Sequence, residues 1–160
     1  MGGGERDGRA RLYAWLSRRL YAELAWAYDA VSWLVSLGHW STWRRAALDH
    51  LPEGRVLELG FGTGALLEEM ARRGWRAVGV EPSAAMQRVT ARRLRRAGLA
   101  VPRVRARAEA LPFCDGSYDA LMCTFPAGYI LSPETLHEAA RVLRPGGTFA
   151  VGGLYLVTDV

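Results

Sequence analysis

Apolar positions in the first third of the chain recur every three or four residues, which is the spacing of one helix face. This spacing predicts helical structure from residue 10 to about residue 37, and Ser41 can cap a second helix that runs to about His50. Residues 1–9 are rich in glycine and charge, which is typical of a disordered tail. The pattern therefore predicts a tail followed by an N-terminal helical cap over residues 10–51.

Beyond residue 52 the pattern changes to short apolar runs that alternate with amphipathic segments. Pro145-Gly146-Gly147 predicts a turn before the last run. Because strands alternate with helices, we expect an α/β domain over residues 52–160, with a parallel sheet and helices on both of its faces. The predicted strands are 55–59, 75–80, 101–108, 118–124 and 148–157, and the predicted helices are 63–73, 83–97 and 133–143.

Composition and charge narrow the choice of partner only slightly. The net charge is +5, but all 21 basic residues are arginine, which indicates a coding bias more than a nucleic-acid partner. The arginines between Arg88 and Arg96 predict a solvated helix face. No run approaches the roughly 20 apolar residues of a membrane-spanning helix. Cys114 and Cys123 match neither a disulfide framework nor a metal site, so we expect free thiols, a cytoplasmic protein and no bound metal.

The strongest local signal is the loop Glu58-Leu59-Gly60-Phe61-Gly62-Thr63-Gly64 between a strand and a helix. Glycines let a ligand approach the backbone, and the following helix presents free N–H groups. Gly60, Gly62 and Ala65 also match a dinucleotide loop, so a nicotinamide-dependent dehydrogenase is an alternative. Glu58 suits the amino group of a methionine moiety better than a pyrophosphate. The loop therefore favours S-adenosylmethionine.

A second acidic residue lies where a ribose would be bound. Glu81 ends the second predicted strand, about twenty residues beyond the glycine loop. An acid at a strand end is by itself usually a solvated carboxylate. Combined with the loop, Glu81 is predicted to accept both hydroxyls of a ribose.

These residues, in this order, resemble the class I S-adenosylmethionine-dependent methyltransferases. The blocks 108–113 and 140–147, with the segment 28–45, are similar to the ubiquinone/menaquinone biosynthesis C-methyltransferase group. The resemblance implies a Rossmann-like methyltransferase fold with strand order 3-2-1-4-5. Because the family sheet has seven strands and the sequence ends just past the fifth, we expect the last two to be missing. The fifth strand would then be an exposed edge, and a homodimer could cover it.

The resemblance also implies a cofactor site. The glycine loop would hold the methionine end, Glu81 the ribose, and residues after the third strand the adenine, while the end of the fourth strand would face the sulfonium. Tyr28 would close over the cofactor. The implied cofactor-binding residues are Tyr28, Glu58, Gly60, Phe61, Gly62, Thr63, Gly64, Glu81, Pro82, Ala108, Glu109, Cys123 and Thr124.

Two departures from the family pattern bear on the site. Relatives often carry an acid at the position of Arg107, where it contacts the adenine amino group, so we expect Glu109 or a backbone group to serve instead. Residues 125–129 are unlike the quinone enzymes and also miss the Pro-Pro-aromatic motif of enzymes that methylate DNA bases.

The acceptor is the least defined part of the prediction. Tyr28, His39 and Tyr129 are the candidate bases, although a histidine at such a position is more often a surface or capping residue. Five of the six tryptophans fall within residues 15–43. They either pack the helices on the sheet or form an apolar acceptor pocket that touches a membrane surface.

The sequence thus predicts a methyltransferase that acts on a small apolar or aromatic molecule. The alternatives are a non-catalytic or incomplete S-adenosylmethionine-binding module and, less favoured, an RNA or DNA methyltransferase.

Overall fold

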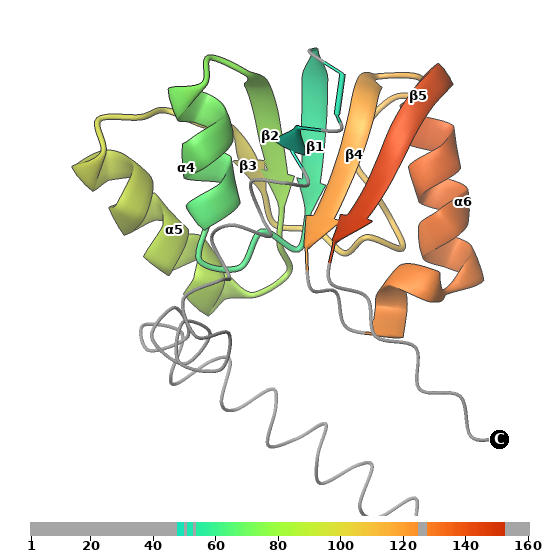
Figure 1. The fold of residues 1–160 in the computed structure, drawn as a ribbon. Helices are drawn as coiled ribbons and strands as arrows, with labels where there is room; N and C mark the ends of the chain where they lie inside the picture. The colour runs from blue at the N-terminus through green and yellow to red at the C-terminus, as the bar shows by residue number, and fades with distance from the viewer. Residues whose placement is uncertain (1–47, 50, 53, 125–127, 153–160) are drawn as a thin grey trace, which may run out of the picture.

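Five parallel strands form the central sheet of the computed structural model, in the order β3-β2-β1-β4-β5 (Figure 1). The structure describes residues 48–49, 51–52, 54–124 and 128–152. The predicted Rossmann-like order is confirmed. The strands are β1 Arg55–Leu59, β2 Arg76–Val80, β3 Arg103–Val104, β4 Tyr118–Thr124 and β5 Leu143–Gly152.

Helices cover both faces of this sheet, as predicted. The helices are α4 Ala65–Arg72, α5 Ala84–Arg96, the 3-10 helix η1 Gly128–Leu131 and α6 Pro133–Val142. In Figure 1, α4 and α5 lie on one side of the strands and α6 on the other. Along β1, Leu57 and Leu59 pack in the cluster that includes Val142 of α6, whereas Val56 packs in the cluster that includes Leu67 of α4. The central strand is therefore buried on both faces, as a parallel sheet requires.

Serine side chains cap the starts of α5 and α6. The Ser83 hydroxyl accepts a hydrogen bond from the Met86 N–H at 3.3 Å at the start of α5. Ser132 does the same for Thr135 N–H at 3.2 Å at the start of α6. Helix α4 has no side-chain cap, because Gly64 at this position adopts a left-handed conformation with φ 74°. Its first N–H groups are thus left for another acceptor.

Two predicted elements differ from the structure. β3 has two residues rather than the predicted 101–108, because the chain after Val104 turns back on itself at Arg107, whose carbonyl accepts from the Ala110 N–H at 3.2 Å. β5 starts at Leu143 rather than at residue 148. The turn predicted at Pro145-Gly146-Gly147 lies within it as an irregularity, where the pairing with β4 shifts register and Gly146 has φ 76°.

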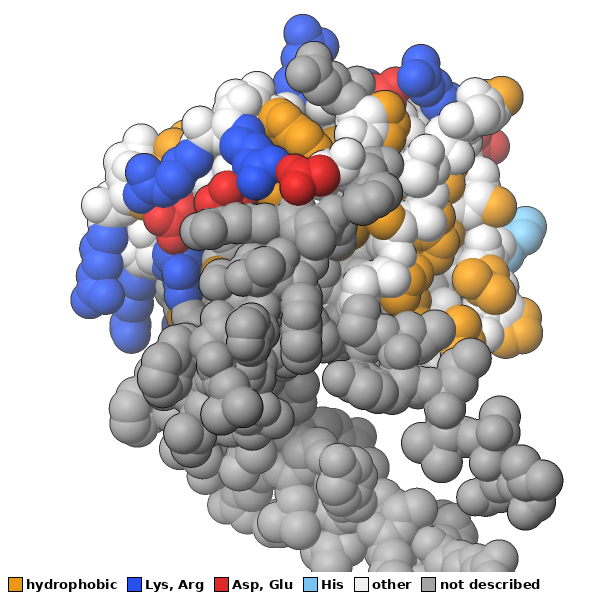
Figure 2. Space-filling model, in the orientation of Figure 1, with side chains coloured by type: hydrophobic (Ala, Val, Ile, Leu, Met, Phe, Trp, Pro, Cys, Tyr) orange, Lys and Arg blue, Asp and Glu red, His pale blue; other side chains and the backbone are white. Residues whose placement is uncertain are grey.

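The predicted tail and most of the predicted helical cap, residues 1–47, lie outside the described residues. Within the described residues β5 is a terminal strand of the sheet, and its Val151 is 36% exposed. Leu131 and Leu136 are also exposed, and Figure 2 shows hydrophobic side chains at the surface on the side of β5 and α6. No helix in the described ranges is long and apolar enough to cross a membrane.

Candidate functional site

The glycine loop after β1 adopts a backbone that only glycine accepts easily. Gly60, Gly62 and Gly64 have φ angles of 68°, 53° and 74°, in the left-handed region that other residues avoid. The loop is tied to the neighbouring strand, since the Gly60 N–H donates to the Val80 carbonyl at 2.8 Å. The glycine pattern is therefore required by the shape of the loop.

Thr90 of α5 supports this loop through a hydrogen bond and a close contact. Its hydroxyl donates to the Gly62 carbonyl at 2.9 Å, and a Cβ added to Gly64 would collide with the Thr90 side chain. Thr90 is completely buried. Sequence analysis did not identify this residue, because a single threonine in a helix belongs to no motif. Its only signal is a small polar side chain on an otherwise apolar face.

Glu81 joins the glycine loop to the start of α5. One of its carboxylate oxygens accepts from the Gly62 N–H at 3.2 Å and the other from the Ser83 N–H at 2.9 Å. The side chain is 8% exposed. Burial raises the pKa of Glu81, and the two backbone hydrogen bonds partly oppose that rise. Each oxygen retains capacity for a second donor such as a hydroxyl.

Glu58 brings a second buried carboxylate to the same end of the sheet. It lies in register with Gly79 of β2 and Met122 of β4 and is 1% exposed. Burial raises the pKa of the Cys123 thiol, and the Glu58 charge adds to that rise. A buried carboxylate at this position suits a cationic group such as an ammonium.

Cys123 and Tyr129 form the β4 side of the site. The Cys123 sulfur lies 3.7 Å from the Tyr129 hydroxyl oxygen. Burial raises the pKa of Cys123 to about 12 and also raises that of Tyr129. Both groups are therefore neutral at pH 7, so Tyr129 can donate a hydrogen bond there but is a poor general base.

The turn after β3 brings Ala108 and Glu109 toward the site. Ala108 is buried. Arg107, at the position where the resemblance leads us to expect an acid, binds Glu109 with a nitrogen–oxygen distance of 2.9 Å. This ion pair lowers the pKa of Glu109, and the Glu109 charge contributes to the raised pKa of Tyr129. Glu109 thus carries the acidic character that position 107 lacks.

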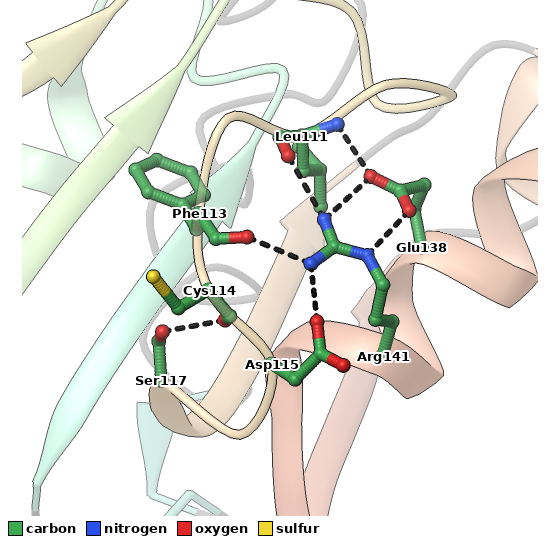
Figure 3. A network of polar contacts seen from close by, with 7 residues as sticks. All are labelled: Leu111, Phe113, Cys114, Asp115, Ser117, Glu138 and Arg141. Atoms are coloured by element: carbon green, nitrogen blue, oxygen red, sulfur yellow. Dashed lines mark hydrogen bonds and ion pairs between the residues drawn. The ribbon is translucent and has the colours of Figure 1, made fainter.

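A clamp around Arg141 holds the next loop in place (Figure 3). Its guanidinium donates to the carbonyls of Phe113 at 2.7 Å and Leu111 at 2.9 Å, and to the Asp115 carboxylate at 2.7 Å. It also binds both oxygens of Glu138, at 2.7 and 2.9 Å. Glu138 in turn accepts from the Leu111 N–H at 2.6 Å. The clamp fixes the segment between the Ala108 turn and β4 against α6.

The other residues implied to bind the cofactor differ in how far they are exposed. The Phe61 side chain packs beneath Gly79 and is 4% exposed, so only its backbone is available to a ligand. Thr63 is buried, Thr124 half-buried and Pro82 exposed. Tyr28 and His39, together with residues 125–127, lie outside the described residues.

Two further observations concern charged and metal-ligating side chains outside this site. No cluster of three or more His, Cys, Asp or Glu side chains among the described residues could hold a metal ion. On α5, Arg88, Arg92, Arg95 and Arg96 are exposed, as a solvated face requires. Arg93 instead pairs with Glu68 of α4 at 3.4 Å.

Comparison with known proteins identifies the family. A family model described as a methyltransferase domain matches residues 56–147, which include the glycine loop, Glu81 and Arg141. The chain belongs to the methyltransferase-domain family. The matched span covers the described sheet from β1 to the first part of β5, so the membership and the observed strand order agree.

Curated relatives of this methyltransferase domain include two bacterial enzymes. A demethylmenaquinone methyltransferase from Thermus thermophilus is 36% identical over 138 residues, which cover 82% of this chain and 63% of the relative. One from Beutenbergia cavernae is 39% identical over 137 residues, covering 82% of this chain and 55% of the relative. The chain thus spans 55% to 63% of the length of these relatives.

Solved structures share the fold at lower identity. An S-adenosylmethionine-dependent methyltransferase from Thermotoga maritima has a TM-score of 0.66 and 28% identity, covering 82% of this chain and 58% of that one. Geranyl diphosphate C-methyltransferase from Streptomyces coelicolor, solved with S-adenosylhomocysteine, has a TM-score of 0.65 and 25% identity, covering 69% and 44%. A [4+2]-cyclase has a TM-score of 0.61 and 26% identity, covering 68% and 43%. The fold alone therefore does not fix the reaction.

Proposed function

We propose that this domain binds S-adenosylmethionine and transfers its methyl group to a small apolar or aromatic molecule. The observation that carries the proposal is the hydrogen bond from the Gly62 N–H to the Glu81 carboxylate, because it joins the glycine loop and the ribose-binding acid into one site. The geranyl diphosphate C-methyltransferase structure, which contains S-adenosylhomocysteine, supports the choice of cofactor.

The described residues fit the parts of this cofactor. The missing side chain at Gly62 leaves the backbone open to the methionine end, and the buried Glu58 carboxylate suits its ammonium group. Glu81 has capacity for both ribose hydroxyls. The exposed ring of Pro82 and the Ala108–Glu109 turn would border the adenine, with Cys123 and Thr124 facing the sulfonium.

The chemistry asks little of the protein beyond orientation. The cofactor supplies a methyl group on a positively charged sulfur, which is an excellent leaving group. The chain holds the two reactants in line and keeps water out. The neutral Cys123 thiol and Tyr129 phenol are suited to this role, because neither competes with the acceptor as a charged nucleophile.

The relatives and the sequence support a proposal for the acceptor and for the domain arrangement. The name demethylmenaquinone methyltransferase supports an aromatic, quinone-type acceptor. We propose that residues 10–51 form a helical cap on the domain formed by residues 52–160, and that the cap tryptophans line the acceptor pocket and touch a membrane surface. The chain spans 55% to 63% of the length of those relatives. The acceptor and the transfer reaction are therefore proposed for the whole protein.

We further propose a homodimer through β5 and a cytoplasmic location. The exposed Val151 on the terminal strand supports the dimer, because strand edges pair readily with a second copy. The free Cys114 and Cys123 thiols support the location, because disulfides are rare in a reducing compartment.

Isothermal titration tests the cofactor, and a transfer assay tests the reaction. We expect saturable binding of S-adenosylhomocysteine at one site and none of NADH. With radiolabelled S-adenosylmethionine, we expect label in an aromatic quinol acceptor. An absence of heat with S-adenosylhomocysteine would refute cofactor binding, and binding of NADH would favour a dehydrogenase. Heat without transfer to any aromatic acceptor would favour a binding module.

A further inference from the structure

The Tyr129 hydroxyl lies directly against the first glycine of the loop. A Cβ added to Gly60 would stand 2.5 Å from the Tyr129 hydroxyl oxygen. Gly60 has φ 68°, so it carries no side chain for a conformational reason as well. The missing side chain leaves a niche over the backbone, and a phenol from the same chain fills it.

The same hydroxyl also covers the end of β4. It lies 3.7 Å from the Cys123 sulfur, and Cys123 is 1% exposed. Burial raises the pKa of Tyr129, and the charges of Glu81 and Glu109, the acids proposed to bind ribose and adenine, add to that rise. Tyr129 therefore lies among the residues proposed to hold the cofactor.

Tyr129 and a ligand cannot use the niche at the same time. A methionine moiety that approaches the Gly60 backbone must take the place of the hydroxyl. Tyr129 belongs to the short helix η1, which is exposed at Gly128 and Leu131.

We propose that the Tyr129 phenol fills the niche between Gly60 and Cys123 in the free protein and moves out when S-adenosylmethionine binds. This inference rests on the proposed function. In the free protein the phenol shields the Cys123 thiol, and in the complex the ligand takes over that shielding. Binding then includes the free-energy cost of moving the phenol. The apparent affinity equals the intrinsic affinity multiplied by the fraction of molecules in which the niche is open.

Thiol labelling reports the closed state without any enzymatic activity. The chain has two cysteines, so a Cys114→Ser background leaves Cys123 as the single target. In this background we expect Tyr129→Ala to raise the rate of Cys123 labelling by N-ethylmaleimide at least about tenfold, because the shielding group is gone. For Tyr129→Phe, which keeps the ring but lacks the hydroxyl, we expect a labelling rate between those of the parent and Tyr129→Ala. Leu131→Ala in the same turn is the matched control and should label like the parent.

Adding S-adenosylhomocysteine then tests whether ligand and phenol share the niche. We expect it to restore slow labelling in Tyr129→Ala, and to bind this variant at least as tightly as the parent. Equal labelling of Tyr129→Ala and the parent without ligand would overturn the inference. So would ligand binding that leaves Cys123 reactive in Tyr129→Ala, or a tenfold weaker affinity of that variant. If the parent binds no S-adenosylhomocysteine, the proposed function fails, whereas the labelling without ligand still decides whether Tyr129 shields Cys123.

Discussion

At the scale of single residues, the site depends on a few buried groups whose partners are backbone atoms. Glu81 connects Gly62 and Ser83 through its two oxygens, so one side chain both shapes the loop and offers acceptors to a ligand. The Thr90 side chain lies so close to Gly64 that no larger residue fits at position 64 without a shift. Small changes at these positions should therefore separate ligand binding from folding.

Replacing Glu81 by glutamine should weaken binding of S-adenosylhomocysteine more than it destabilises the protein. The amide keeps the size but loses the charge and one acceptor. Hydrogen bonds to charged groups contribute about 1.5–3 kcal/mol each, so we expect a loss of roughly tenfold or more in affinity by isothermal titration. Glu134→Gln, on the exposed start of α6, is the control. An unchanged affinity in Glu81→Gln would exclude Glu81 as a ligand-binding residue.

Gly64→Ala should destabilise the fold more than Gly74→Ala. Their φ angles are similar, 74° and 77°, so the backbone strain of about 1–2 kcal/mol is shared. Gly74 has open space around it, whereas an alanine at Gly64 would meet buried Thr90. We expect urea unfolding to show a loss of about 1–2 kcal/mol for Gly74→Ala and at least about 1 kcal/mol more for Gly64→Ala. Equal losses would mean that α5 does not press on the loop.

At the scale of elements, the site is positioned by contacts between segments far apart in the chain. Arg141 of α6 uses its guanidinium to hold the loop before β4 through Leu111, Phe113 and Asp115. Gln87 of α5 donates to carbonyls at the ends of both β2 and β3, each at 3.0 Å. Gln87 thus fixes the carboxyl ends of β2 and β3, whereas Arg141 fixes the loop that leads into the amino end of β4.

Acid should weaken the Arg141 clamp through Glu138. Its ion pair with Arg141 lowers the pKa of Glu138 to about 2. A depressed carboxyl pKa stabilises the fold above the ordinary value near 4.5, and this contribution is lost as the pH falls toward 2. We expect the free energy of unfolding to fall less steeply in that window for Glu138→Gln than for the parent. Glu134→Gln should keep the parent slope, and identical slopes in all three proteins would contradict the clamp.

Some of these elements could be predicted from sequence and others could not. β4 was predicted at its observed bounds, because its short, mostly apolar segment lies between turn residues and is too short for a helix. β3 was predicted too long, because its apolar residues continue into a turn that only pairing with β2 reveals. The loop and Glu81 follow a motif. Thr90, Arg141 and the niche at Tyr129 depend on contacts with residues at least 26 positions away in the chain, which no local pattern encodes.

At the scale of the whole molecule, β5 is the strand at one edge of the described sheet. In the described residues this strand pairs with β4 and with no other strand. Its Val151 is exposed, as are Leu131 and Leu136 nearby in the fold. An exposed strand edge readily accepts a second copy of the chain.

A charge on this strand should therefore reduce self-association. We expect analytical ultracentrifugation to show a concentration-dependent dimer for the parent and a monomer for Val151→Lys, because a lysine blocks pairing at an edge. Leu136→Lys, which charges the exposed side of α6 instead, should leave the dimer intact. A parent that stays monomeric at all concentrations would refute the proposed homodimer.

The central claim is that the glycine loop and Glu81 together bind S-adenosylmethionine. A crystal structure of the protein with S-adenosylhomocysteine tests this most directly. We predict both ribose hydroxyls within about 2.5–3.0 Å of the Glu81 carboxylate, the methionine end over Gly60 and the adenine beside Ala108. A ribose that lies away from Glu81, or a ligand bound elsewhere on the chain, would contradict the account.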